Sequence, residues 1–151
     1  MIYIGVDPGK KGGYAIIMDG NSGTYPWDDV AFALFIASMN VQSDILEEPI
    51  VCAVEKVGAM HGQGVTSMFS FGHSLGYIEG VLTAEDISYQ LVPPATWKRE
   101  FSLIGKDKAA SVEVCRKLFP GVNLLPTDKC RKESDGMAEA LLLAEYARRK
   151  M

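Results

Sequence analysis

Two acidic residues stand alone at the ends of apolar segments in this sequence. Asp7 closes the segment Met1-Ile-Tyr-Ile-Gly-Val-Asp, and Glu55 closes Pro49-Ile-Val-Cys-Ala-Val-Glu. Both segments are rich in β-branched residues, which predicts strands, and a charge without a partner is costly to bury there. If the two strands are neighbours, the carboxylates repel each other unless a divalent cation holds both in the ionised form. Carboxylate oxygens suit hard cations such as Mg²⁺ and Mn²⁺.

A second acidic pair lies near the C-terminal end of the chain. Asp135 and Glu139 are four residues apart, so they share one face at the start of a predicted helix. Taken alone, such a pair fits one acid that favours the helix dipole and one solvated surface acid. Together with Asp7 and Glu55, the pair predicts a cluster of four carboxylates that binds two metals. Two metals can activate a water for in-line attack on a phosphodiester and stabilise the leaving oxygen.

The length and composition predict one globular domain over residues 1–151. Hydrophobic residues make up 48% of the chain and charged residues 23%, which is close to the globular average. No apolar run approaches the roughly 20 residues that span a bilayer, so we expect a cytoplasmic protein without a membrane partner. The three cysteines, Cys52, Cys115 and Cys130, lack CxxC spacing, which predicts free thiols rather than a disulfide scaffold or a zinc ribbon.

The charge is divided unevenly along the chain. The net charge of −4 at first disfavours a nucleic-acid partner, because phosphate binding usually brings a basic surplus. Residues 1–95, however, hold 3 Lys and Arg against 11 Asp and Glu, whereas residues 96–151 hold 12 against 8. The C-terminal third is therefore basic. An ordinary solvated surface and a phosphate-binding surface both fit this asymmetry.

The order of the expected elements is βββαβαβα followed by one more helix at the C-terminal end, with a hairpin at the start and crossover connections later. This order predicts an α/β fold in which a mixed sheet is covered by helices on both faces. Strands are expected at residues 1–7, 14–18, 24–27, 49–55 and 87–92, and helices at 29–39, 65–84, 107–119 and 134–150.

Three glycines, Gly72, Gly76 and Gly80, are four residues apart and so share one face of the helix expected at 65–84. Their small size favours either close packing of this helix on the sheet or a helix–helix contact across a dimer.

Three acidic blocks also carry a family resemblance. Ile4-Gly-Val-Asp-Pro-Gly, Ala53-Val-Glu-Lys-Val and Asp135-Gly-Met-Ala-Glu-Ala-Leu, in this order and spacing, resemble the RuvC-type Holliday-junction resolvases of the ribonuclease H-like superfamily. The resemblance covers nearly the whole chain, and the short length and the drift from the family sequence suggest a phage or viral version. It implies a five-stranded mixed sheet and a homodimer that cuts two strands of branched, four-way DNA with Mg²⁺ or Mn²⁺. It also implies that Asp7, Glu55 and Glu139 are metal ligands and that the products carry 5′-phosphate and 3′-hydroxyl ends.

Basic residues extend the resemblance. Lys98 and Lys108 resemble the functionally important basic residues that the family carries after its fifth strand and at the start of the next helix. Each could meet a phosphate beside the metals as a point charge. Arg99 and Lys106 are expected to contact the DNA backbone as well, and the surface could continue over Lys129, Arg131 and Lys132.

The chain departs from the family pattern at two places. RuvC proteins commonly end their site with two Asp three residues apart, but the matching positions here are Gly136 and Glu139, so Asp135 is expected to take the missing role. After the second acidic block the family places an aromatic that stacks at the opened junction, and this chain has Gly58 there. The candidates to replace that aromatic are Met60, His61 and Phe69.

The leading hypothesis is a crossover junction endodeoxyribonuclease that nicks branched DNA in pairs, with Asp7, Glu55, Asp135 and Glu139 as metal ligands. One rival is an actin-like ATP-dependent phosphotransferase, in which Lys10, Lys11 and nearby glycines would hold phosphates. Such kinases need two domains, and the chain has no Walker-type Gly-Lys-Ser/Thr loop. The other rival is a noncatalytic module that binds branched DNA. Intact acids in all three blocks count against it. Trp97 and Tyr146 are expected to pack in the core, and neither His61 nor His73 is expected to bind metal.

Overall fold

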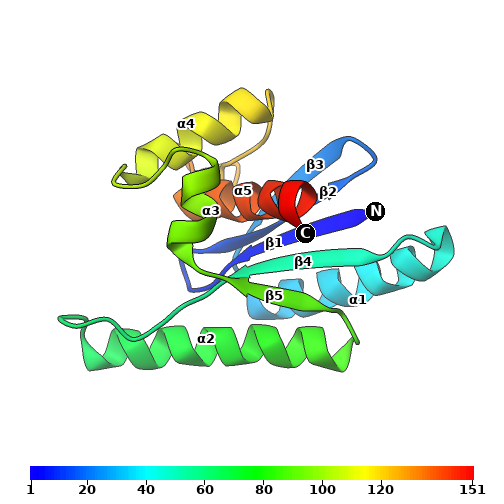
Figure 1. Ribbon diagram of the computed structural model, residues 1–151, viewed down its shortest axis with the longest axis horizontal. Coiled ribbons are helices and arrows are strands. Elements are labelled where there is room, and N and C mark those ends of the chain that lie inside the picture. The colour runs from blue at the N-terminus through cyan, green and yellow to red at the C-terminus, as the bar shows by residue number, and fades with distance from the viewer.

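The computed structural model describes residues 1–151 as a five-stranded mixed sheet with helices on both faces (Figure 1). This arrangement confirms the predicted α/β fold. The strands are β1 (Ile2–Asp7), β2 (Gly13–Met18), β3 (Asn21–Pro26), β4 (Ile50–Glu55) and β5 (Tyr89–Val92), and the helices are α1 (Asp29–Leu46), α2 (Val65–Ala84), α3 (Pro94–Glu100), α4 (Lys108–Leu118) and α5 (Asp135–Lys150).

The sheet has the strand order β3-β2-β1-β4-β5. Strands β1, β2 and β3 pair antiparallel, whereas β4 is parallel to both β1 and β5. A two-residue turn joins β2 to β3 through Asp19 and Gly20, both with positive φ. Because this turn is so tight, β3 begins at Asn21 rather than at the predicted residue 24. Strand β4 lies inside the sheet between β1 and β5, as its apolar run predicts.

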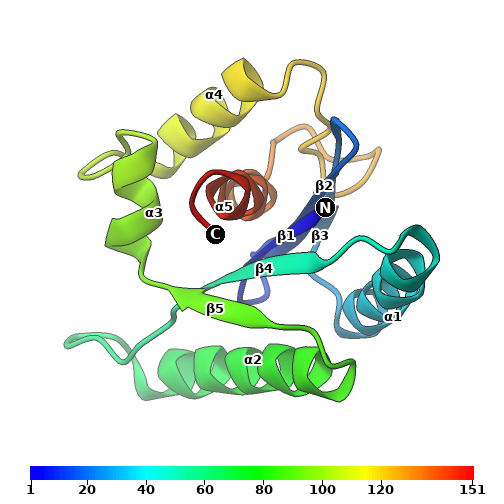
Figure 2. The same cartoon turned by 45° about the vertical axis from the view of Figure 1, so that its right-hand side comes forward.

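The helices form two layers, with α3, α4 and α5 on one face of the sheet and α1 and α2 on the other (Figure 2). Helix α5 lies directly on the sheet because Gly5 of β1 has no side chain. A Cβ at Gly5 would overlap the backbone of Ala140. Gly136 does the same at the start of α5, where a Cβ would overlap the carbonyl oxygen of Lys11. The first turn of α5 is thereby fixed beside the end of β1.

One helix is absent from the sequence expectations. The pair Pro93-Pro94 predicts only the end of a strand, but α3 begins at Pro94. Proline suits the first turn of a helix because its φ is already helical and its missing N–H would have no partner there. This short helix carries Trp97 and Lys98, so the omission affects the site.

Helix α1 is longer than predicted and ends at Leu46 rather than at residue 39. No Gly or Pro interrupts residues 40–46, and the helix stops where Glu47 adopts a left-handed conformation. By length and composition alone α1 could cross a membrane, but Phe32 and Ile36 pack in the core against the sheet. Its outer side exposes Val30, Leu34, Val41 and Ile45.

The glycine face of α2 points away from the sheet. No atom lies within 4 Å of a Cβ placed at Gly72, Gly76 or Gly80, so the expected packing of these glycines on the sheet is wrong. Val65 and Phe69, which precede them on the helix, are 80% and 78% exposed. The other explanation, a helix–helix contact, is compatible with this open face.

Candidate metal centre

The ends of two neighbouring strands bring Asp7 and Glu55 together. Strands β1 and β4 are parallel with Val6 opposite Val54, so the next residue of each strand is one of the two acids. The first turns of α5 add Glu139. One carboxylate oxygen from each of Asp7, Glu55 and Glu139 lies within 4.8 Å of the others. Three of the four acids singled out in the sequence therefore converge at this edge of the sheet.

Glu55 is held by a buried tryptophan. The indole Nε1 of Trp97 donates a hydrogen bond of 2.7 Å to Oε2 of Glu55. Trp97 packs in the core, as the sequence analysis expected, and has no exposed surface. The ammonium of Lys98, the next residue of α3, lies 5.3 Å from the centre of the Trp97 ring. Helix α3 thus supplies both a donor to the acid and a cation beside it.

Glu139 is held by a buried serine in a similar way. The hydroxyl of Ser111 on α4 donates a hydrogen bond of 3.1 Å to Oε1 of Glu139. Glu139 is 7% exposed and Ser111 is 3% exposed, so this contact is shielded from water. Asp7 differs from both glutamates because no group of the protein donates a hydrogen bond to its carboxylate.

Burial and mutual repulsion make all three acids difficult to ionise. Burial, followed by the charges of Glu55 and Glu139, raises the pKa of Asp7 well above 3.8. Burial is also the largest cause that raises the pKa of Glu55 and of Glu139. A divalent cation would reverse this by favouring the ionised form of each acid. The donor set, three carboxylates with free oxygens and no thiol or imidazole, suits Mg²⁺ or Mn²⁺.

Asp135, the fourth predicted acid, has a different partner. Its Oδ2 lies 3.3 Å from Nζ of Lys108, and it is not among the acids whose oxygens converge. The neighbouring position cannot supply an acid either, because Gly136 is pressed against the backbone of Lys11 and Gly12. The arrangement is therefore a group of three carboxylates with an adjacent ion pair.

A cleft of about 550 Å³ opens over the three acids. Lys98 and Lys108 line it, as the sequence analysis expected, but Arg99 and Lys106 do not and are exposed elsewhere. Three further lysines line the cleft, and the sequence did not single them out for a DNA surface. Lys10 and Lys11 follow Asp7 in the β1–β2 turn, and Lys56 follows Glu55. Their positions within four residues after one of the two acids are the signal that could have identified them.

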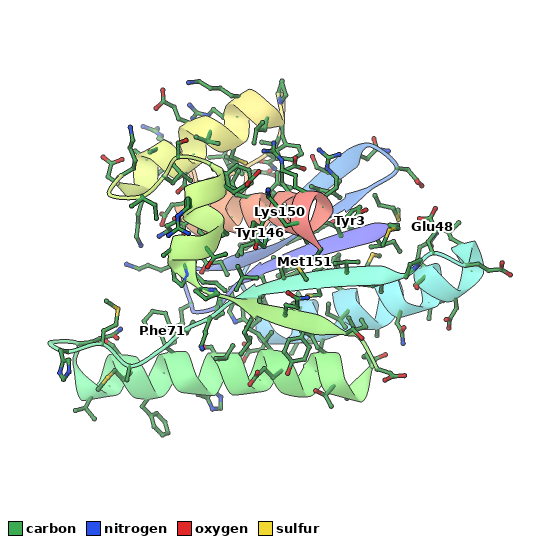
Figure 3. All side chains as sticks on the ribbon, in the orientation of Figure 1. Tyr3, Glu48, Phe71, Tyr146, Lys150 and Met151 are labelled. Atoms are coloured by element: carbon green, nitrogen blue, oxygen red, sulfur yellow. The ribbon has the colours of Figure 1, made fainter.

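The cleft wall formed by α2 contains an aromatic residue. Phe71 lines the cleft and packs on Gly9, and Figure 3 shows it on the sheet side of α2. Of the three residues considered as replacements for the family aromatic, only Met60 lines the cleft. His61 is exposed outside it, and Phe69 is on the outer side of α2. Phe69 and Phe71 lie in the same helix, and the spacing alone does not indicate which of the two faces the cleft.

Comparison with known proteins gives matches at the level of structure. No protein-family profile and no curated protein sequence matches the chain. Thermus thermophilus RuvC in complex with a Holliday junction substrate matches with a TM-score of 0.59 and 14% identity over 99% of this chain and 96% of that one. The chain has the RuvC-type resolvase fold.

Two other solved structures give the same result. A second Thermus thermophilus RuvC structure matches with a TM-score of 0.50 and 16% identity over 99% of this chain and 96% of that one. The yeast mitochondrial Holliday junction resolvase matches with a TM-score of 0.55 and 14% identity over 97% of this chain and 77% of that one. The sequence resemblance to RuvC-type proteins is thus confirmed for the fold, which aligns over nearly all of the chain.

Proposed function

We propose that this RuvC-type chain is a metal-dependent endonuclease that resolves four-way or other branched DNA junctions by paired nicking. The observation that carries the proposal is the convergence of Asp7, Glu55 and Glu139 in a cleft lined by lysines. Acids alone would repel a phosphodiester, and lysines alone would bind it without cutting. The combination fits phosphate hydrolysis with a divalent cation. The fold, shared with a RuvC solved on a Holliday junction substrate, supports branched DNA as the substrate.

The acids and the lysines of the cleft would have separate roles in the reaction. Asp7, Glu55 and Glu139 would hold Mg²⁺ or Mn²⁺, with Glu139 as the main ligand from α5. When bound, divalent cations activate a water for attack on phosphorus and stabilise the leaving oxygen. Lys98 is placed to meet the charge that develops on the phosphate, because it lies beside Glu55 in the cleft wall. A two-metal version of the site requires Asp135 to exchange Lys108 for a cation.

The remaining cleft lysines would hold the DNA backbone. Lys10, Lys11 and Lys56 line the cleft on the side of the β1–β2 turn and the β4 end, whereas Lys98 and Lys108 come from α3 and α4. A DNA backbone that enters the cleft would therefore find lysine ammonium groups on both sides of the acids. This local surplus explains how a chain with a net charge of −4 can bind nucleic acid. Its affinity should fall steeply with salt concentration.

Paired nicking needs two sites, and we propose a homodimer formed through the outer face of α2. This face combines exposed Val65 and Phe69 with the open glycines Gly72, Gly76 and Gly80. The glycines would allow two α2 helices to approach closely about a two-fold axis, with the aromatic and aliphatic side chains covering each other. A second copy of the chain is the occupant that gives one cleft for each of the two strands to be cut.

Incision of a labelled four-way junction tests the proposal. The wild type should make symmetric nicks with Mg²⁺ or Mn²⁺, leave 5′-phosphate ends and lose activity in EDTA. Asp7→Asn should bind the junction but cut it about 10³-fold more slowly, because it removes a charged ligand. Junction binding without incision under any metal would contradict the proposal and favour the noncatalytic module. ATP turnover without nicking would instead favour the phosphotransferase.

A further inference from the structure

Each glutamate of the centre uses one oxygen on a donor from the protein. Oε2 of Glu55 accepts from the indole of Trp97, and Oε1 of Glu139 accepts from the hydroxyl of Ser111. The second oxygen of each glutamate accepts no hydrogen bond from the protein, and neither oxygen of Asp7 does. Each glutamate is thus engaged by the protein through one oxygen, and its other oxygen has no donor from the protein.

The two donors are themselves fixed in position. Trp97 has no exposed surface and packs against Phe101, with ring centres 6.5 Å apart. Ser111 is 3% exposed and lies in α4, which packs against α5. A buried indole cannot change rotamer without opening the core. Its N–H therefore fixes the orientation of the Glu55 carboxylate, as the serine hydroxyl does for Glu139.

One free oxygen per glutamate matters for the choice of cation. Mg²⁺ takes six ligands at about 2.1 Å in octahedral geometry and uses carboxylates through single oxygens, whereas Ca²⁺ takes six to eight ligands at about 2.3–2.6 Å and often uses both oxygens of a carboxylate. A cation that chelated Glu55 through both oxygens would have to share Oε2 with the indole N–H and approach it on the lone pair that the N–H leaves open. The same holds for Glu139 and the serine hydroxyl.

We propose that Trp97 and Ser111 are positioning residues that orient Glu55 and Glu139 so that the oxygen without a protein donor is the favoured metal ligand, and that they thereby make the centre bind Mn²⁺ and Mg²⁺ in preference to Ca²⁺. This inference rests on the proposed metal centre. Neither residue touches the cation or the DNA in this scheme. Each acts through the carboxylate that it holds.

Equilibrium cation binding by the full chain tests the inference without any cleavage. Free Mn²⁺ is followed by electron paramagnetic resonance, and Ca²⁺ is then added as a competitor. Trp97→Phe keeps an aromatic ring in the core and removes the indole N–H together with the second ring, so it should weaken Mn²⁺ binding about 10-fold, the usual size of such a second-layer effect. The preference for Mn²⁺ over Ca²⁺ should fall at least about threefold, because Glu55 becomes free to chelate through both oxygens.

A matched control exists in the same chain. Trp27 also donates its indole N–H to a carboxylate, that of Asp29, at 2.8 Å, but outside the cleft. Trp27→Phe should therefore leave both Mn²⁺ affinity and cation preference unchanged. Ser111→Ala should shift the preference in the same direction as Trp97→Phe, and Ser111→Thr, which retains the hydroxyl, should restore it.

The outcomes separate this inference from the function on which it rests. If the wild type binds no Mn²⁺, both the metal centre and the positioning role are wrong. If the wild type binds Mn²⁺ but folded Trp97→Phe keeps the wild-type preference over Ca²⁺, the positioning role of Trp97 is overturned and the metal centre stands. If Trp97→Phe does not fold, the Ser111→Ala and Ser111→Thr pair decides, and equal preferences in those two variants overturn the inference.

Discussion

Helix α5 buries 11 of its 16 residues against one face of the sheet, whereas helices α1 and α2 on the other face leave large apolar side chains in solvent. In α5 every residue from 136 to 145 is buried, and Gly5 and Gly136 bring its backbone into contact with the sheet and the β1–β2 turn. Helices α1 and α2 instead expose Leu34, Ile45 and Phe69. The difference indicates that the α5 layer holds the acidic residues in fixed positions, and it leaves on the α1/α2 layer the exposed apolar side chains on which the proposed dimer depends.

The glycines of the two layers give the sharpest contrast. Gly136→Ala places a methyl group on the carbonyl oxygen of Lys11, and this backbone cannot move without displacing α5. We expect a loss of at least about 3 kcal/mol in the free energy of unfolding, measured with urea on dilute protein. Gly80→Ala meets no atom within 4 Å and should raise the same quantity by about 0.5–1 kcal/mol, through helix propensity. Equal effects at the two glycines would contradict the contrast.

Replacing a lysine inside the cleft should slow incision far more than replacing one outside it. Lys98→Ala removes the cation that lies beside Glu55, and we expect single-turnover incision to slow about 10²-fold, the usual cost of one stabilising donor. Lys106→Ala alters an exposed residue outside the cleft and should change the rate less than about threefold. A large effect from Lys106 would mean that the DNA takes another path across the chain.

Self-association should depend on the α2 face and not on the α1 face. Gly76→Arg adds a charged side chain where the monomer has open space, so folding should be retained while the dimer weakens about 30-fold, as expected for an unpaired charge buried in an interface. Val41→Arg alters the exposed side of α1 and serves as the control. Sedimentation equilibrium measures both dissociation constants. A larger effect at Val41 would move the proposed interface from α2 to α1.

The smallest expected effect concerns stability without metal. Because burial and two neighbouring acids raise the pKa of Asp7, its ionisation destabilises the native protein as pH rises from 3.8 through the raised value. Asp7→Asn removes this cost and should stabilise the metal-free protein by about 0.5–2 kcal/mol at pH 7, with little difference below pH 3.8.

Thermal unfolding in EDTA, repeated with Mn²⁺, checks this sign. The cation should stabilise the wild type and not the Asn variant. Asp135→Asn is the matched control, because that acid is paired with Lys108 and should give no gain in EDTA. A wild type that is more stable than Asp7→Asn at pH 7 in EDTA would contradict the repulsion described for the three acids.

Local sequence signals predicted the acids but not the residues that hold them. The apolar runs themselves indicate strands that end in Asp7 and Glu55. The four-residue spacing of Asp135 and Glu139 indicates that both lie on one face of a helix. The roles of Trp97 and Ser111 depend on where α3 and α4 meet the sheet, which no local pattern encodes. Helix α3 was missed because Pro93-Pro94 signals an interruption whether or not a helix follows.

The position of Asp135 shows the limit of spacing arguments. Four-residue spacing places Asp135 and Glu139 on one face of α5, and both line the cleft. Only Glu139 reaches the other acids, since a lysine from α4 engages Asp135. The sequence contains both residues of that ion pair, but their proximity depends on the packing of α4 against α5.

The most direct test of the central claim is a crystal structure of the wild type with Mn²⁺, in which anomalous scattering locates the ion. The account predicts a peak about 2.1 Å from one oxygen of each of Asp7, Glu55 and Glu139, with the indole of Trp97 still bonded to the second oxygen of Glu55. A saturated crystal with no peak between these three acids, or with Mn²⁺ bound only at Asp135, would contradict it.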